Sequence, residues 1–141
     1  MKKIFISSDH AGYNLKELIK KKFSKKYKLQ DLGPDNSVVS VNYPDFAHKL
    51  CKKMSNNSSN MGILVCGSGM GMSMAANRHK RIRAAVCYSL KNTKLSRLHN
   101  NANIITLGSR LTNKNTAFKL IEVFINTKFE GGRHKIRVKK I

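Results

Sequence analysis

The feature that most constrains this chain is a continuous apolar run that ends in a glycine-rich segment. Met61-Gly62-Ile63-Leu64-Val65-Cys66 contains no polar residue and is followed by Gly67-Ser68-Gly69-Met70-Gly71. Such a run is typical of a strand buried on both faces of a parallel sheet, and glycines permit a tight turn into a helix. The sequence therefore predicts a central strand, a turn, and a helix that reaches about Arg78.

Other apolar runs and helical spacings alternate along the rest of the chain. Further strands are predicted at residues 4–6, 27–32, 84–87 and 104–107, of which the second is the more exposed. Helices are predicted at residues 15–23, after Tyr43-Pro44, at 90–98 and at 116–125, with a polar loop at 55–60. This alternation predicts one α/β domain, residues 1–141, with a parallel sheet of about five strands.

The charge of the chain bears on its partners. The 28 basic and 7 acidic residues give a formal net charge of +21, which favours acidic partners. Most of the basic residues are scattered lysines without clustered aromatic or arginine readers. We therefore expect a phosphate-bearing small molecule and no specific nucleic acid.

The three cysteines and the first residues of the chain indicate the cellular compartment of the protein. Cys51, Cys66 and Cys87 fit neither a disulfide framework nor a CxxC motif. The first residues are too polar for a signal peptide or a membrane-spanning helix. We expect a cytoplasmic protein with no membrane partner.

Polar segments follow three of the predicted strands. They are Ser8-Asp9-His10, the glycine-rich segment, and Gly108-Ser109-Arg110. The carboxyl ends of parallel strands border the ligand crevice of such sheets. The glycine-rich segment matches neither the dinucleotide fingerprint nor a Walker A loop, so it is either an anion or oxyanion hole or only a tight turn.

Acidic residues are absent between Asp45 and Glu122. A base contributed to the glycine-rich segment by that span is therefore not a carboxylate. With so few acids and no metal-binding motif, Mg²⁺, Ca²⁺ or a catalytic zinc would lack its usual ligands. We expect no metal and no cofactor.

The remaining candidates for catalysis are Cys66, His99 and Asp9. Cys66 ends the central strand in basic surroundings, which favour a thiolate; the alternative is a packed strand residue, our interpretation of Cys51 and Cys87. His99 precedes the last strand and either approaches the crevice or caps a helix. His48, His79 and His134 are interpreted as solvated or capping groups. Gly131-Gly132 gives Arg133 and a second arginine the freedom to grip one phosphate.

Several motifs form an ordered series along nearly the whole chain. They are Ser8-Asp9-His10-Ala11-Gly12, Asp45 after Tyr43-Pro44, Cys66-Gly67-Ser68-Gly69-Met70-Gly71, Ala75-Ala76-Asn77, Leu95-Ser96-Arg97, His99-Asn100, Gly108-Ser109-Arg110 and Glu130-Gly131-Gly132-Arg133-His134. The series closely resembles the type B ribose-5-phosphate isomerases, of the family shared with galactose-6-phosphate isomerase. The resemblance runs from Ile4 to Arg137.

The resemblance implies a three-layer α/β/α Rossmann-like domain and an aldose–ketose isomerase. The implied reaction interconverts ribose 5-phosphate and ribulose 5-phosphate through an enediolate, in the non-oxidative pentose phosphate pathway, without metal or nucleotide. The resemblance also implies a homodimer or tetramer whose sites mix residues of two chains. A tail, about residues 127–141, would then pack on a partner subunit.

The same resemblance implies roles for individual residues. Cys66 is the base that moves the proton between C1 and C2, His99 is the acid that opens the furanose ring, and Asp9 polarises the ring oxygen or the hydroxyl side. The other implied roles are an oxyanion hole of Gly67, Ser68, Gly69, Met70 and Gly71, a phosphate clamp of His10, Arg110, Arg133 and Arg137, a sugar contact at Asn100 and a pocket wall at Tyr43. Met72 stands where some relatives carry Glu instead of the thiol, which indicates the thiol branch.

Two alternatives stay open at this point. One is an isomerase of a six-carbon sugar phosphate such as allose or galactose 6-phosphate. The other is a basic nucleic-acid-binding module on the same scaffold, which the net charge of +21 favours.

Overall fold

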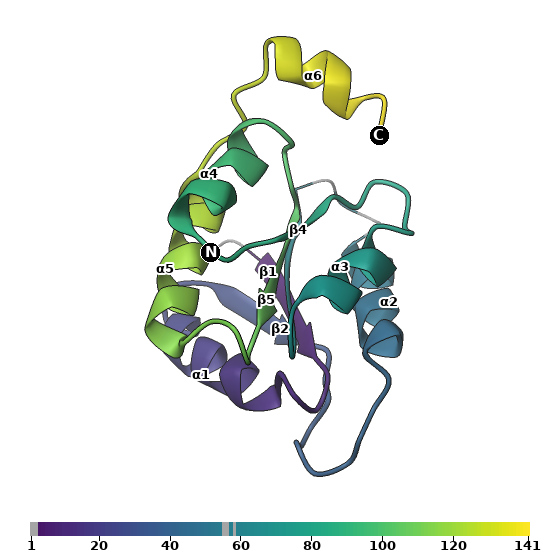
Figure 1. The fold of residues 1–141 in the computed structure, drawn as a ribbon, viewed down its shortest axis with the longest axis vertical. Helices are drawn as coiled ribbons and strands as arrows, with labels where there is room; N and C mark the ends of the chain where they lie inside the picture. The colour runs from purple at the N-terminus through teal and green to yellow at the C-terminus, as the bar shows by residue number, and fades with distance from the viewer. Residues whose placement is uncertain (1–2, 55–56, 58) are drawn as a thin grey trace.

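A parallel five-stranded sheet forms the centre of the protein, in a computed structural model that describes residues 3–54, 57 and 59–141 (Figure 1). The strands are β1 (Lys3–Ser8), β2 (Lys28–Asp31), β3 (Met61–Cys66), β4 (Ala84–Val86) and β5 (Ile104–Gly108). Their order in the sheet is β2-β1-β3-β5-β4, and every neighbouring pair is parallel. β3 lies in the middle with all of its residues buried, as its apolar sequence predicts.

Helices cover both faces of the sheet and give three layers (Figure 1). One face carries α1 (Tyr13–Phe23), α4 (Leu90–Leu98) and α5 (Lys114–Asn126), and the other carries α2 (Tyr43–Met54) and α3 (Met70–Ala76). Alternate residues of β1 point to opposite faces, so Ile4 and Ile6 pack towards α1 and α5 while Phe5 packs towards α2. The α/β/α architecture expected from the sequence is confirmed.

Among the described residues, no helix has the length and apolar character that crossing a membrane requires.

The predicted elements differ from the structure mainly at their ends. The helix after the glycines stops at Ala76 rather than near Arg78, because the side chain of Asn77 exchanges two hydrogen bonds with the backbone of Ala84, at 2.8 and 2.9 Å. β4 is only half-buried, although Ala84, Ala85 and Val86 are all apolar, because it forms an edge of the sheet. Of the predicted polar loop at 55–60, Ser55, Asn56 and Ser58 lie outside the described residues.

The end of the chain carries a short helix, α6 (Arg133–Val138), where the sequence predicts only a tail. Figure 1 shows α6 beyond the end of α4, standing off the three-layer body. The helix begins after Gly131 and Gly132, which both have positive φ, at 73° and 55°. These backbone conformations favour glycine and turn the chain into α6.

A buried lysine on α1 is the least expected feature of the fold. Lys16 is fully buried, and its ammonium donates to both carboxylate oxygens of Asp31, at 2.8 and 2.9 Å, and to the carbonyl oxygen of Pro34, at 2.7 Å. Lys20 donates to the same carboxylate at 2.6 Å. Burial would raise the pKa of Asp31, but the hydrogen bonds from both lysines and from the Gly33 N–H outweigh it and hold that pKa below its usual range. Asp31 thereby fastens α1 to the end of the edge strand β2.

Replacing Asp31 by Asn should lower the free energy of unfolding by about 3–5 kcal/mol, because Lys16 would stay buried without its closest and hydrogen-bonded counter-charge. Urea unfolding followed by circular dichroism measures this loss. Glu17→Gln is the matched control: Glu17 lies 3.6 Å from Lys16 and 2.8 Å from Lys20, but its side chain is 39% exposed. We expect the control to cost less than about 1 kcal/mol, and equal losses in the two variants would contradict the role given to Asp31.

The same carboxylate should make stability depend on acid pH. The folded state holds the pKa of Asp31 below its ordinary value of 3.8, so the stabilisation is complete above that value and is lost as the pH falls through the lower folded value. Below about pH 4 the wild-type chain should therefore lose stability more steeply than Asp31→Asn. Unfolding curves at a series of acid pH values provide the comparison, and parallel slopes would argue against the linkage.

Candidate active site

A cleft of about 420 Å³ opens at the carboxyl edge of the sheet. It is bordered by the loops that follow β1, β3 and β5 and by the start of α2. Its lining residues are Asp9, Tyr43, Cys66, Gly67, Ser68, Gly71, Arg110 and Leu111. All but Leu111 are candidate residues from the sequence, so the structure brings a large part of the predicted site together.

Hydrogen bonds tie the bordering loops to one another. The Asp9 N–H donates to the carbonyl oxygen of Val65 at 3.1 Å, and the Ser109 N–H donates to that of Cys66 at 2.8 Å. The hydroxyl of Ser109 also donates to the carbonyl oxygen of Ala11, at 2.8 Å. These bonds continue the pairing of the strands beyond their ends, so the three loops that border the cleft are held in fixed positions relative to one another.

The sulfur of Cys66 faces the glycine turn. Cys66 is the last residue of β3, and the Gly69 N–H donates to its Sγ at 3.1 Å. Gly69 precedes α3 in a left-handed conformation, with φ of 78°, which directs its N–H back towards the strand. A donor of this kind bonds more strongly to a thiolate than to a thiol.

Asp9 and Arg110 bring opposite charges to the cleft. Asp9 is only 7% exposed, and one of its carboxylate oxygens accepts from the Gly12 N–H at 2.9 Å, which leaves the other oxygen for a ligand hydroxyl. The guanidinium of Arg110 lies over Gly67, where a Cβ would come within 2.9 Å of its Nη1. The cleft can therefore hold both the hydroxyls and the anionic group of one ligand.

Tyr43 forms one wall of the cleft. Its ring lies so close to Gly71 that a Cβ there would be 2.5 Å from the ring carbon Cζ. Glycine is thus required at Gly71 for the ring to approach, which agrees with the pocket wall expected at Tyr43.

Three further candidates are Ser68, which lines the cleft, and Met70 and His10, which lie outside its lining. Ser68 accepts from the Met70 N–H at 3.2 Å, and Met70 itself is half-exposed outside the cleft lining. His10 follows Asp9 but is also outside the lining, and its Nδ1 accepts from the Val41 N–H at 3.1 Å. The neutral His10 ring therefore carries its proton on Nε2, where it can donate to an anion.

His99, Asn100 and Arg137 lie at the opposite edge of the sheet. They line a second cleft, of about 360 Å³, together with His134, Val138 and Ile141. His99 caps the carboxyl end of α4 and precedes the amino end of β5, whereas Cys66 ends its strand. Of the two alternatives that the sequence left open for His99, the structure shows the helix cap, and His99 does not approach the crevice of its own chain. Arg133 and Arg137 stand on α6, equally outside the cleft of Cys66.

The ring of His99 stacks on His134, with centroids 4.1 Å apart and planes inclined by 13°. Glu130 Oε2 lies 3.6 Å from the Nε2 of His99 and 3.7 Å from the Nε2 of His134. Burial and the positive charges of His99, Arg133 and Arg137 lower the pKa of His134, although Glu130 opposes them. The interpretation of His134 as a solvated group was wrong, because it is buried against His99. The four-residue spacing of Glu130 and His134 was the signal available in the sequence.

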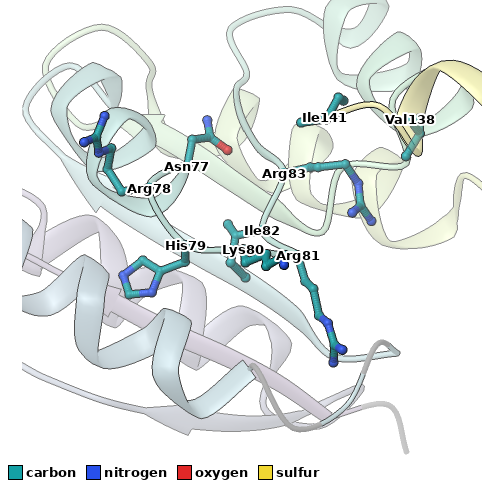
Figure 2. A pocket seen from close by; sticks show the side chains of 9 residues that line it. All are labelled: Asn77, Arg78, His79, Lys80, Arg81, Ile82, Arg83, Val138 and Ile141. Carbon is teal, nitrogen blue, oxygen red and sulfur yellow. The ribbon is translucent and has the colours of Figure 1, made fainter.

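A third hollow, of about 380 Å³, lies between the basic loop at residues 77–83 and the end of the chain (Figure 2). The side chains of Arg78 and Arg81 point away from one another in Figure 2. His79 instead approaches α2, where its Nε2 lies 2.6 Å from the Nδ1 of His48. These basic side chains do not converge on one centre (Figure 2), and none of them lines the cleft of Cys66.

A family model described as Ribose/Galactose Isomerase matches residues 4–141. The chain belongs to this family. Similar proteins include a probable ribose-5-phosphate isomerase B of Mycoplasma genitalium, 42% identical over 140 residues that cover 98% of this chain and 92% of that protein. Another is the ribose-5-phosphate isomerase B of Escherichia coli, 35% identical over 142 residues that cover 100% of this chain and 95% of that protein.

Solved structures of this isomerase family share the fold. A ribose 5-phosphate isomerase of Thermotoga maritima has a TM-score of 0.94 at 44% identity and covers 99% of this chain and 96% of its own. The Mycoplasma genitalium enzyme with bound ribulose 5-phosphate also has a TM-score of 0.94, at 41% identity. The match covers 98% of this chain and 92% of the chain of that enzyme. The resemblance found in the sequence motifs is confirmed.

Cys66 should be the first thiol of the native protein to react with iodoacetamide, because it alone of the three lines the cleft. Cys51 and Cys87 are each 1% exposed, and burial raises the pKa of Cys51 to about 12 and also raises that of Cys87. Peptide mass spectrometry after brief alkylation identifies the modified residue. A Cys66→Ser variant should stay unmodified over the same time, and modification of Cys51 or Cys87 at the rate of Cys66 would refute the assignment.

Proposed function

We propose that this chain is an aldose–ketose isomerase that interconverts ribose 5-phosphate and ribulose 5-phosphate. The observation that carries this proposal is the cleft at the carboxyl edge, where a thiol, a carboxylate and a guanidinium border one hollow. The chain belongs to a family whose members include ribose-5-phosphate isomerases B, and one of these enzymes has been solved with ribulose 5-phosphate bound.

Cys66 acts as the base in the proposed reaction. As a thiolate it removes the proton from C2 of the open-chain aldose, and the resulting thiol returns a proton to C1 of the enediolate. The hydroxyl proton passes from O2 to O1 in the same conversion, so that a carbonyl forms at C2 and a hydroxyl at C1. The negative charge that develops on oxygen is stabilised by the first N–H groups of α3, which have no acceptor within the helix. Gly71 lies in the first turn of α3 and lines the cleft, so we assign one of these N–H groups to it.

Ring opening requires an acid at the ring oxygen as well as a partner for the hydroxyl group. The free carboxylate oxygen of Asp9 accepts from the sugar hydroxyl. Among the described residues that line this cleft there is no histidine. The acid is therefore supplied from elsewhere, and we assign it to His99 of the partner subunit.

Two copies of the chain form each site in this proposal. Cys66 and His99 lie at opposite edges of one sheet, in separate clefts. A two-fold dimer apposes the same surfaces reciprocally, so the first cleft of each copy meets the second cleft of the other. Exposed apolar side chains lie near both clefts, with Leu111 at the first and Ile136 and Ile141 on or beside α6, and a partner would cover them.

The phosphate group is held from both sides of this interface. In one copy, His10 and Arg110 bind the phosphate. In the other copy, Arg133 and Arg137 of α6 bind the same phosphate, and Asn100 contacts the sugar. Guanidinium groups bind phosphate through paired N–H donors. This arrangement gives α6, which stands off its own body, a function in the neighbouring copy.

The proposed setting is the cytoplasm and the non-oxidative pentose phosphate pathway. Cys51, Cys66 and Cys87 are all unpaired, as expected of a protein in a reducing compartment. Every step above is assigned to side chains and backbone groups of the chain itself, so the proposed reaction uses no resident metal.

Changing Cys66 to Ala should lower kcat by about 10²–10⁴-fold, the contribution of a positioned base, while KM changes little because the phosphate contacts remain. The measurement is an isomerase assay with ribose 5-phosphate, with allose 6-phosphate and galactose 6-phosphate run in parallel. Cys51→Ala is the control and should retain activity. Near-normal kcat in Cys66→Ala would move the base to Asp9 or His99, and faster turnover of a six-carbon phosphate would replace the proposed substrate.

Co-expression of a Cys66→Ala chain with a His99→Asn chain should restore activity that neither variant has alone. Random pairing makes half of the dimers mixed, and each mixed dimer has one intact site, so about a quarter of wild-type activity is expected. The assay compares the whole co-expressed protein, without separation of the mixed dimers, with each variant alone. If all catalytic residues acted within one chain, mixing would restore nothing.

A further inference from the structure

We propose that His99, Glu130 and His134 form a binding site for a divalent transition-metal ion of the zinc type. Each residue offers one ligand atom, and these atoms all lie within 4.8 Å of one another. Two of the three residues, His99 and His134, line the second cleft, at the opposite edge of the sheet from Cys66. Its existence is independent of the proposed isomerase function, and only its effect on activity rests on that function.

The spacing of the ligand atoms suits a metal better than a hydrogen bond. Glu130 Oε2 lies 3.6 and 3.7 Å from the two imidazole nitrogens, whereas hydrogen bonds between nitrogen and oxygen span about 2.7–3.2 Å. Zinc bonds of about 2.0–2.2 Å at tetrahedral angles place neighbouring ligand atoms roughly 3.3–3.5 Å apart. The two imidazole rings are stacked almost parallel, with planes inclined by 13°, so their in-plane nitrogen lone pairs do not point at one centre in this arrangement. Coordination therefore requires the ring of His99 to turn out of the stack and Glu130 to follow it, and both of these side chains are partly exposed.

The backbone holds these residues in place. The Glu130 N–H donates to the carbonyl oxygen of Leu98 at 3.1 Å, which puts Glu130 beside His99 at the end of α4. The turn at Gly131 and Gly132 then brings His134, four residues after Glu130, onto the ring of His99. The three ligands therefore come from two segments already joined without an ion.

The ligand types indicate which ions fit. Two imidazoles and one carboxylate suit zinc and its neighbours among the transition metals and leave a coordination position for water. Mg²⁺ and Ca²⁺ prefer sets of oxygen ligands, so they should bind weakly here. No nucleotide or other cofactor is needed to complete the site.

An ion at this position would occupy the Nε2 of His99 and so engage the ring of the proposed acid. Bound zinc should therefore inhibit the isomerase, and its removal by a chelator should restore activity. The cluster would make the enzyme sensitive to free zinc without using zinc in its reaction.

Isothermal titration of Zn²⁺ into chelator-treated, full-length protein tests the site directly. We expect one ion per chain with a dissociation constant in the micromolar range, and no comparable heat with Mg²⁺. A titration with Co²⁺ should give visible absorption bands of a nitrogen and oxygen ligand set, without a thiolate charge-transfer band. Absence of Zn²⁺ binding, or a thiolate band, would overturn the proposal.

Variants identify the ligands. Glu130→Gln and His134→Gln should each weaken Zn²⁺ binding by about tenfold or more, and Glu130 is exposed enough for its variant to fold normally. The matched control is His79→Gln, because His79 and His48 form a second histidine pair, 2.6 Å apart. Unchanged affinity in both ligand variants, or lost affinity in His79→Gln, would refute the assignment.

The outcomes separate this proposal from the proposed function, because binding is measured without substrate. An active isomerase that binds no zinc would overturn only the metal site. A chain that binds zinc at these residues but isomerises no sugar phosphate would overturn only the proposed function.

Discussion

The register of β3 between its two neighbours determines the geometry of the candidate site. Cys66 is paired with Gly108 of β5, and Val65 is paired with Ser8 of β1, so three loops leave the sheet at one level. A slip of one residue would turn the thiol to the other face of the sheet. The thiol of Cys66, the carboxylate of Asp9 and the guanidinium of Arg110 therefore lie close together because of how the strands pair. The glycine turn after β3 does not determine that arrangement.

The part of the site that could be predicted from the sequence follows from the same rule. Asp9, Cys66 and Arg110 each stand at or just after the end of a predicted strand, and parallel strands share one carboxyl edge. The rule also excludes His99 from that edge, because His99 precedes β5. The alternative that placed it in the crevice of its own chain failed because closeness to a strand along the chain was taken as closeness to the carboxyl end of that strand.

Other features could not be predicted because they depend on contacts between distant segments. Lys16 lies in a lysine-rich stretch that is typical of an exposed surface, yet it is buried by Asp31 and Pro34, which are 15 and 18 residues away. The role of His134 depends in the same way on α4, which ends 35 residues earlier at the cap His99. Local patterns predicted the five strands and every helix except α6, whereas contacts between segments distant along the chain could not be predicted from them.

In the proposed shared-site dimer, the separation of the two clefts would make catalysis depend on protein concentration. A lone chain contains both halves of the proposed site but cannot join them, because the length of the sheet lies between. By mass action, dilution below the dissociation constant of the dimer would abolish turnover while every chain stayed folded. At such concentrations, activity would rise more steeply than in proportion to the amount of protein made.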